Sequence, residues 1–501
     1  MSKFLRGKLR KAEVMQGEMT NYKRILLVNP AIDKEKKYGK LVSMMLTPSV
    51  PLSIVFLGTF LESQGYEVRL FDEQIEWLDE QRIQALVNEF HPGVIGFTCT
   101  TPGMARAHEI AADIKKVNPE IKVVMGNIHP TVLPEETLRD VNVDLVVRGE
   151  GEFTMLEYLQ ALEHKGDISK IDGISYRLNG GYYHTGQRAY EKDLDVFPPV
   201  NWKLLTDFHS SYVIEWILTS RGCPYKCVFC SARSISGYKY RFNSPQRVIH
   251  EVDNVVNNYG ARFFSFADDN FVVKKDRARQ ICNLLIERGY HKYTKWLCQT
   301  RADAVDQPLL ELMREAGCEY ISFGIETGTQ RLLDLIGKSL KIETIEKAVN
   351  LAHQVGIKTR GSFMLGLPTE TREESLATID FALRLPLDIA KFNLAVPYPG
   401  TELLNMAIAE GLQVTGDWSK INTAAGLSDT QAFYIPKGRT MAELAKLQKM
   451  AHAKFYLRPK QIWRILKREN IDFNLPKIRS PRQFFELMGA AAEFLVHTIK
   501  K

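Results

Sequence analysis

Short apolar runs alternate with helix-like segments along the first third of the chain. Five runs rich in β-branched and aromatic residues predict strands, at residues 25–29, 67–71, 94–98, 122–126 and 144–148. Between them, apolar side chains recur at helical spacing in residues 52–64, 80–90 and 104–117. Strands that are apolar nearly throughout and alternate with helices are typical of a parallel sheet covered on both faces. We therefore expect a doubly wound α/β domain, whose ligand lies at the carboxyl ends of the strands.

The same alternation resumes after residue 211. Strand-like runs occupy residues 212–220, 261–268, 295–301, 318–326, 358–366 and 389–397. Helix-like segments lie between them, at residues 245–259, 275–288, 308–316, 342–355 and 372–385. Six such β/α units predict an open, partial barrel with its functional residues at the carboxyl ends of the strands. After about residue 438 the pattern becomes helical, in residues 441–459, 460–470 and 481–501.

The composition is that of a soluble globular protein of several domains. Hydrophobic residues make up 45% and charged residues 25% of the 501 residues. This composition excludes a chain that is mainly disordered or fibrous. The net charge of +7 is concentrated at the ends, with +5 in residues 1–24 and +10 in 437–501, against −8 between them. The chain has neither a signal-peptide pattern nor an apolar run long enough to span a bilayer. We therefore expect a cytoplasmic protein.

Three of the seven cysteines crowd into eight residues directly after the strand-like run 212–220. Cys223, Cys227 and Cys230 have the spacing C-x3-C-x2-C. Three thiolates can hold three irons of a 4Fe-4S cluster and leave the fourth iron open to a ligand. The alternative, a structural zinc site, normally needs four protein ligands. The other four cysteines are expected to be structural: Cys99, Cys282, Cys298 and Cys318.

This cysteine motif, with the aromatic Phe229 before its last cysteine, resembles that of the radical S-adenosylmethionine (SAM) superfamily. In that superfamily the open iron binds the amino and carboxylate groups of SAM, whose reductive cleavage yields a 5′-deoxyadenosyl radical. The resemblance implies that Asp268 or Asp269 recognises the SAM amino group and that Arg301 recognises the carboxylate. It implies that Glu326 lies near the ribose or methionine end of SAM. A carboxylate such as Asp269 can also be a helix N-cap.

The domain before the cysteines, with the segments GNIHPTVLPEE and VVRGEGEFT, resembles that of the cobalamin-binding branch of the superfamily. The resemblance covers about residues 23–430 and implies cobalamin contacts at the strand ends. These candidates are Asn29, Thr98, Gly126, His129, Gly149 and Glu150. The chain lacks the Asp-x-His-x-x-Gly motif whose histidine binds cobalt in many cobalamin domains. His129 follows the fourth strand rather than the first, so we do not assign it as the axial ligand; a loop histidine bonded to backbone is the alternative.

These patterns predict five parts of the chain. They are a basic N-terminal extension (1–22), a Rossmann-like, cobalamin-binding α/β domain (23–165), a linker (166–210), a partial (β/α)6 radical SAM barrel (211–430) and a basic helical C-terminal segment (431–501). In the last part, residues 460–470 form a basic amphipathic helix that includes Trp463. This helix either packs on the barrel or attaches to the inner face of an anionic membrane.

We expect an enzyme that uses a 4Fe-4S cluster, SAM and cobalamin to modify an unactivated carbon of a small-molecule, lipid-like or tetrapyrrole-like substrate. Methyl transfer is the favoured reaction, and radical oxidative cyclisation or rearrangement is the alternative. A further alternative is a non-catalytic sensor of cobalamin or of iron–sulfur state. A flavodoxin or ferredoxin is the expected reductant. No nucleic-acid partner is expected, because the basic end carries no DNA-reading motif.

Overall fold

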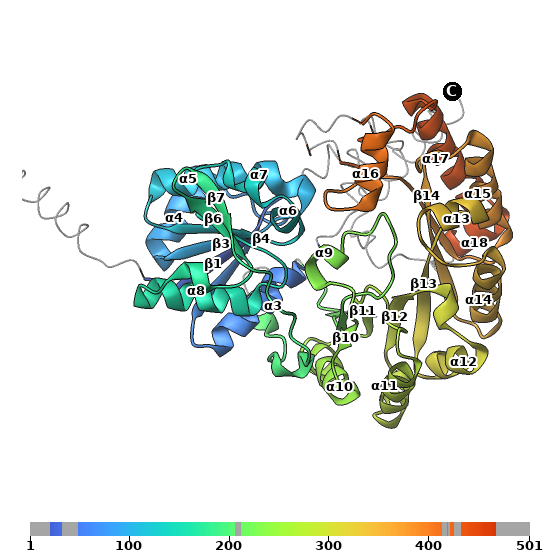
Figure 1. Cartoon of the computed structure of the whole chain (residues 1–501). Helices are drawn as coiled ribbons and strands as arrows, with labels where there is room; N and C mark the ends of the chain where they lie inside the picture. Colours follow the sequence, from blue (N-terminus) through green and yellow to red (C-terminus); the bar gives the residue numbers. More distant parts are fainter. Residues whose placement is uncertain are drawn as a thin grey trace, which may run out of the picture. The chain divides into compact units, whose positions relative to one another are not determined.

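The computed structural model describes residues 21–32, 49–205, 212–412, 418, 421–424 and 432–466 (Figure 1). The contacts between residues divide these into two compact units. The first unit contains the described residues of 1–31, 51–189 and 200–207, and the second contains the remainder. Residues 1–20 of the predicted N-terminal extension and the predicted helix 481–501 lie outside the described residues.

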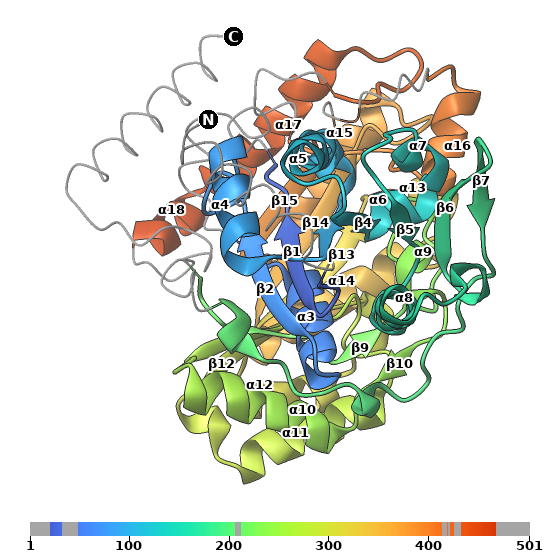
Figure 2. The ribbon, with the colours of Figure 1, turned by 90° about the vertical axis from the view of Figure 1, so that its left-hand side faces the viewer.

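The first unit is built on a sheet of seven strands in the order β2-β1-β3-β4-β5-β6-β7. The five parallel strands are β1 (Arg24–Asn29), β2 (Glu67–Asp72), β3 (Val94–Thr98), β4 (Lys122–Gly126) and β5 (Leu145–Val147). Helices α3 (Leu52–Ser63) and α8 (Glu152–His164) cover one face, and α4 (Glu80–Phe90) and α5 (Met104–Val117) cover the other (Figure 1, Figure 2). The strand order reverses between β1 and β3, which confirms the predicted doubly wound sheet and marks the site where such sheets bind ligands.

Part of the segment expected as a linker belongs to this sheet. Residues 166–210 contain β6 (Ile174–Leu178) and β7 (Gly181–His184), which extend the sheet as antiparallel strands. Asn179 and Gly180 connect them with φ values of 51° and 79°. Asn-Gly between two strands favours the tight two-residue hairpin turn, because both residues adopt positive φ at low cost. This signal is in the sequence, and it identifies a hairpin where a connection was expected.

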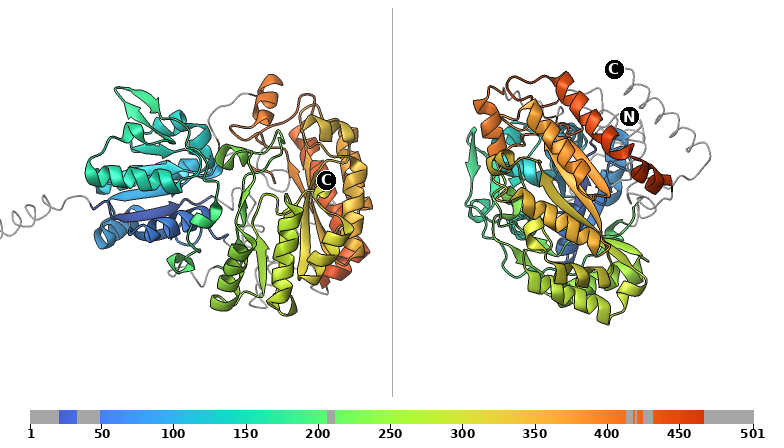
Figure 3. Two further views of the ribbon diagram at one scale, coloured as in Figure 1. Left: turned by 60° about the horizontal axis from the view of Figure 1, so that its bottom comes forward. Right: turned by 90° about the vertical axis from the view of Figure 1, so that its right-hand side faces the viewer.

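The second unit is built on six parallel strands that adjoin in the order β8-β11-β12-β13-β14-β15. They are β8 (Trp216–Ile217), β11 (Phe263–Phe266), β12 (Lys295–Thr300), β13 (Cys318–Glu326), β14 (Lys358–Leu365) and β15 (Ile389–Leu394). The intervening helices are α10 (Pro245–Asp253), α11 (Lys275–Glu287), α12 (Gln307–Glu315), α14 (Ile342–Gln354) and α15 (Arg372–Arg384). They line the outer face of the curved sheet (Figure 3). This arrangement confirms the predicted open, partial barrel.

The core of the second unit lies between this outer face and its helices. It contains fully buried large side chains from β12, β13, β14 and β15, namely Trp296, Phe323, Phe363 and Phe392. Helix α17 (Met441–Tyr456) packs on β15, and its buried Gln448 donates a hydrogen bond to the Phe392 carbonyl at 2.7 Å. Helix α18 (Pro459–Leu466) follows it, so the predicted helical C-terminal segment is present up to residue 466. None of the helices in the described ranges is both long and apolar enough to cross a bilayer.

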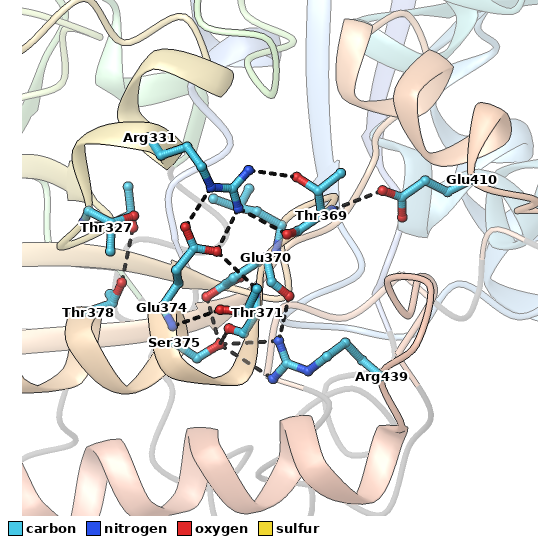
Figure 4. Close-up of polar contacts among 12 residues, drawn as sticks. Thr327, Arg331, Thr369, Glu370, Thr371, Glu374, Ser375, Thr378, Glu410 and Arg439 are labelled. Carbon is cyan, nitrogen blue, oxygen red and sulfur yellow. Dashed lines mark hydrogen bonds and ion pairs between the residues drawn. The ribbon is translucent and has the colours of Figure 1, made fainter.

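A hydrogen-bonded cluster holds the loop that follows β14 (Figure 4). The buried Glu370 carboxylate accepts hydrogen bonds from the Leu367 N–H and the Ser375 hydroxyl, both at 2.7 Å. Arg439, which precedes α17, donates to the Glu370 carbonyl at 2.9 Å. Arg331 of α13 (Gln330–Leu335) pairs with Glu374 in the first turn of α15. The cluster therefore joins the carboxyl end of β14 to α13, α15 and the C-terminal segment.

We predict that Glu370→Gln removes a pH-dependent loss of stability. Burial raises the pKa of Glu370 from 4.5 to about 7, so folding favours the protonated carboxyl. The stability it contributes is complete below pH 4.5 and is lost as the pH rises through about 7. In urea denaturation at pH 8, the glutamine variant should exceed the wild type by up to about 3 kcal/mol. The two proteins should be nearly equal at pH 5, and a constant difference at both pH values would contradict the assignment.

Candidate active site

The three-cysteine motif lies on a loop that backbone contacts hold in place. The loop follows β9 (Ser220–Arg221), which pairs with β10 (Arg241–Phe242). Gly222 has φ +81°, and a Cβ there would lie 2.3 Å from the Lys239 carbonyl oxygen, so only glycine fits. In the middle of the loop, the Val228 N–H donates to the Ile336 carbonyl at 3.0 Å, and the Val228 carbonyl accepts from Leu403 N–H at 2.9 Å. The loop is thus tied to residues from distant parts of the barrel.

The thiols of this loop are half-buried, whereas the other four cysteines are buried. Burial raises the pKa of Cys223, the charges of Asp269 and Cys227 raise it further, and Arg301 lowers it. Burial also raises the pKa of Cys230, and the charges of Asp269, Cys227 and Cys223 add to this effect. Within the described ranges, no three Cys, His, Asp or Glu side chains surround one point as a single metal ion requires. A 4Fe-4S cluster does not require this, because each thiolate binds a different iron of the cluster.

Arg301 lies beside this loop, and one nitrogen of its guanidinium donates to no described residue. Its guanidinium is buried, stacks on the Tyr225 ring at 3.7 Å from the centroid, and donates two hydrogen bonds to Asp303 at 3.0 Å. Its Nη1 atom is also buried and has no hydrogen-bond partner among the described residues. A buried donor of this kind is costly unless a ligand pairs with it. The planar guanidinium suits a carboxylate such as that of SAM.

Asp268 and Asp269 have different surroundings. The buried Asp268 carboxylate accepts hydrogen bonds from the backbone N–H groups of Thr219 (2.6 Å) and Ser220 (2.8 Å) and from the Thr219 hydroxyl. It therefore fixes the backbone that enters the cysteine loop. Asp269 remains accessible to solvent, although protein packed around its carboxylate raises its pKa. The N-cap of the following helix α11 is Lys274, so Asp269 does not cap that helix.

Glu326 forms a buried ion pair that the sequence did not reveal. Glu326 ends β13 with φ +70°, and its Oε1 atom lies 2.8 Å from Lys338 Nζ. Both side chains are buried. A Cβ at Gly324 would come within 2.6 Å of this carboxylate, so a larger residue there would displace the carboxylate from its present position. Lys338 Nζ lies 5.8 Å from the centroid of the Phe229 ring, which connects the pair to the cysteine loop. The only signal in the sequence is a lysine inside the apolar run that precedes α14.

A second group of polar side chains lies at the carboxyl ends of the strands in the first unit. The Thr98 hydroxyl lies 2.7 Å from the Ser53 hydroxyl and accepts a hydrogen bond from Asn127 at 2.7 Å. The Gly149 N–H donates to the Thr131 hydroxyl at 3.0 Å. Asn127 has φ +80°, and Gly149 has φ +77°. These small residues leave the backbone open to close approach by a large ligand such as cobalamin.

The remaining candidates in the first unit differ in their hydrogen bonds and in their burial. Asn29 donates a hydrogen bond to Asp72 at 2.8 Å, which joins the ends of β1 and β2. Gly126 ends β4, and Glu150 is half-buried after β5. His129 is 1% exposed, and burial lowers its pKa to about 4, so its ring is neutral. Its Nε2 atom lies 3.6 Å from Glu136, inside the unit.

The comparisons with known proteins assign a family to each of the two units. Residues 217–382 match the radical SAM superfamily, and residues 43–159 match the B12-binding domain family. The chain is 35% identical over 441 residues to an uncharacterized methyltransferase of Pyrococcus horikoshii, covering 87% of this chain and 93% of that protein. It is 30% identical over 366 residues to the anaerobic magnesium-protoporphyrin IX monomethyl ester cyclase of Rubrivivax gelatinosus, covering 70% of this chain and 65% of the cyclase.

A solved structure shares the fold. It is that of TsrM from Kitasatospora setae, a radical SAM methyltransferase with cobalamin and a 4Fe-4S cluster bound. The TM-score is 0.67 at 20% identity, covering 78% of this chain and 76% of TsrM. The chain is therefore a radical SAM enzyme. Within that superfamily it belongs to the cobalamin-binding family, and its cofactors are a 4Fe-4S cluster, SAM and cobalamin.

We predict that Cys227→Ala abolishes cluster binding. After anaerobic reconstitution, the wild type should hold about four irons per chain, whereas the variant should hold almost none, because each ligating thiolate is needed. The buried Cys99→Ala variant is the control and should retain the wild-type iron content. If the alanine variant keeps the iron content and the ultraviolet–visible absorption of the wild type, Cys227 does not bind the cluster.

We predict that Lys338→Met destabilises the protein by about 3–5 kcal/mol, because it leaves the Glu326 carboxylate buried without its partner. The double variant Glu326→Gln/Lys338→Met should lose less, since it buries no unpaired charge. Urea denaturation measures both, and Lys347→Met, which removes an exposed cation on α14, is the control. Equal losses in the single and double variants would show that the ion pair is not the cause.

Proposed function

We propose that this chain is a methyltransferase that transfers a methyl group to an unactivated carbon of a small-molecule substrate. The observation that carries the proposal is the presence, in one chain, of a cobalamin-binding unit and of a cysteine loop beside an arginine with a spare buried donor. The 35% identical relative named as a methyltransferase supports it. When bound, the cluster supplies the electron that cleaves SAM, and cobalamin supplies a carrier for the methyl group.

In the second unit, we assign Cys223, Cys227 and Cys230 to the cluster. Arg301 holds the SAM carboxylate through its Nη1 atom, which has no partner among the described residues. Asp269, which is accessible to solvent, holds the amino group, while Asp268 orients the loop through Thr219 and Ser220. Glu326 binds the ribose or methionine end of SAM, in an orientation that Lys338 sets.

In the first unit, we assign the cobalamin contacts to the strand ends. The contacting residues are Asn29, Thr98, Gly126, Gly149 and Glu150. His129 is buried, and we do not assign it as a ligand of cobalt. The domain boundaries set out from the sequence remain our proposal, with residues 174–184 moved from the linker to the first domain because they pair with its sheet.

The second candidate reaction is radical oxidative cyclisation or rearrangement. The 30% identical cyclase supports it, because that protein matches 70% of this chain. The two reactions differ in what becomes of the methyl group of SAM. The sensor alternative does not fit this chain, because the chain belongs to a family of enzymes.

We further propose that the enzyme works in the cytoplasm with a flavodoxin or ferredoxin as reductant. On α18, Gln461 donates to the Leu387 carbonyl at 3.1 Å and Arg464 pairs with Asp388 at 2.7 Å, which supports packing on the barrel. Ile462 and Trp463 are 41% and 59% exposed beside the basic residues of this helix. These side chains support an additional contact with the inner face of an anionic membrane.

The test is an anaerobic assay of the reconstituted enzyme with methyl-labelled SAM, a reductant and fractionated small molecules. We expect label in a product, with S-adenosylhomocysteine and 5′-deoxyadenosine formed in equal amounts, since one SAM donates the methyl group and a second is cleaved. Cyclisation would instead give 5′-deoxyadenosine and an unlabelled product. The Cys227→Ala variant should form neither 5′-deoxyadenosine nor a labelled product.

A further inference from the structure

Two neighbours hold Arg301 in one orientation. Its Nε and Nη2 atoms each donate to one carboxylate oxygen of Asp303 at 3.0 Å. This two-point pairing fixes the rotation of the guanidinium within its own plane. The guanidinium carbon lies over the Tyr225 ring, 3.7 Å from its centroid, and this stack fixes the plane itself. The direction of Nη1, the buried nitrogen that has no partner among the described residues, is therefore also fixed.

The two neighbours come from different parts of the chain. Asp303 lies two residues after Arg301, in the short turn that follows β12. Tyr225 lies in the cysteine loop, between Cys223 and Cys227. Burial raises the pKa of Cys223 and the charge of Arg301 lowers it, so the guanidinium is near enough to act on that thiol. The stack therefore connects the residue that we assign to the SAM carboxylate with the loop that we assign to the cluster.

This arrangement orders Arg301 before SAM binds. A free arginine side chain has many rotamers, and fixing them only when a ligand binds weakens the affinity for that ligand. Arg301 is 6% exposed, with Asp303 on one edge of its guanidinium and Tyr225 on one face. Tyr225 is half-buried, and a cation that stacks on a ring is held more strongly when the contact is shielded from water. The cost of ordering Arg301 is thus met in folding rather than in binding.

We propose that Tyr225 and Asp303 are positioning residues that aim the Nη1 atom of Arg301 at the carboxylate of SAM. This inference rests on the proposed function and adds that the cysteine loop itself sets the affinity for SAM. It gives the tyrosine inside the cysteine motif a role that the cluster does not require, because the cluster needs only the three thiolates of the loop. Neither Tyr225 nor Asp303 contacts SAM in this arrangement, and both act through Arg301.

The test measures the affinity for SAM without turnover. Each protein is reconstituted anaerobically with its cluster and cobalamin and is kept without reductant, so that SAM is not cleaved. The Kd for radiolabelled SAM is then measured by equilibrium dialysis at equal iron content. The variants are Tyr225→Leu, which removes the ring, Tyr225→Phe, which keeps it, and Asp303→Asn. The matched control is Tyr238→Leu, because the Tyr238 hydroxyl accepts a hydrogen bond from another arginine, Arg233, at 2.7 Å.

We expect Tyr225→Leu and Asp303→Asn each to raise the Kd for SAM about tenfold, because each removes one of the two contacts that orient Arg301. Tyr225→Phe should stay within about twofold of the wild type, since it keeps the stacked ring, and the control should equal the wild type. The decisive comparison is the double variant Tyr225→Leu/Arg301→Gln, which should bind SAM no more weakly than Arg301→Gln alone. A residue that acts through Arg301 has no further effect once Arg301 is replaced.

If Tyr225→Leu does not bind the cluster, Tyr225→His, which keeps a smaller flat ring, replaces it in both comparisons. The positioning role is overturned if the Tyr225 variant binds SAM as tightly as the wild type, or if it weakens binding equally with and without Arg301. A wild-type Kd in Arg301→Gln would overturn this role together with the assignment of Arg301 to the SAM carboxylate. A wild type that binds SAM but transfers no methyl group would overturn only the proposed function.

Discussion

The buried carboxylate of Asp268 is the interaction on which the active site depends. It accepts two backbone hydrogen bonds from Thr219 and Ser220 and a third bond from the Thr219 hydroxyl. Arg277 of α11 donates to the Thr219 carbonyl at 2.8 Å, so a cation reinforces the same turn. Desolvating a carboxylate is costly, and charge-assisted hydrogen bonds offset the cost only when every donor stays in place. The chain therefore enters the cysteine loop in one conformation.

The rest of the site follows from that conformation. Gly222 turns the chain where any side chain would strike the Lys239 carbonyl, and Val228 ties the loop to Ile336 and Leu403. Arg301 reaches the loop from the end of β12, and Lys338 reaches Phe229 from beyond β13. These contacts join the loop to the segments that follow β12, β13 and β15. The carboxyl ends of parallel strands converge, and so these groups can surround one small cofactor.

The two faces of the barrel sheet differ in composition. The outer face holds the large buried side chains that join the sheet to its helices. The other face combines polar side chains such as Gln299, Ser322 and Ser362 with an apolar cluster of Phe263, Leu297, Tyr320 and Ile389. The buried cluster around Glu370 fixes the loop after β14, and through Arg439 it connects that loop to the C-terminal segment.

The sequence by itself determined the parallel strands of both sheets, several of the helices between them and the three cysteines, because these depend on local periodicity and spacing. Even the hairpin at Asn179 and Gly180 was present as a local signal, although the surrounding segment was interpreted as a linker. Only the tertiary structure decided the roles of Asp268 and Asp269, since adjacent carboxylates look alike until burial and hydrogen bonds separate them. The Glu326–Lys338 pair also needed the fold, because the irregular register at the end of β13 brings together residues that no sequence spacing connects.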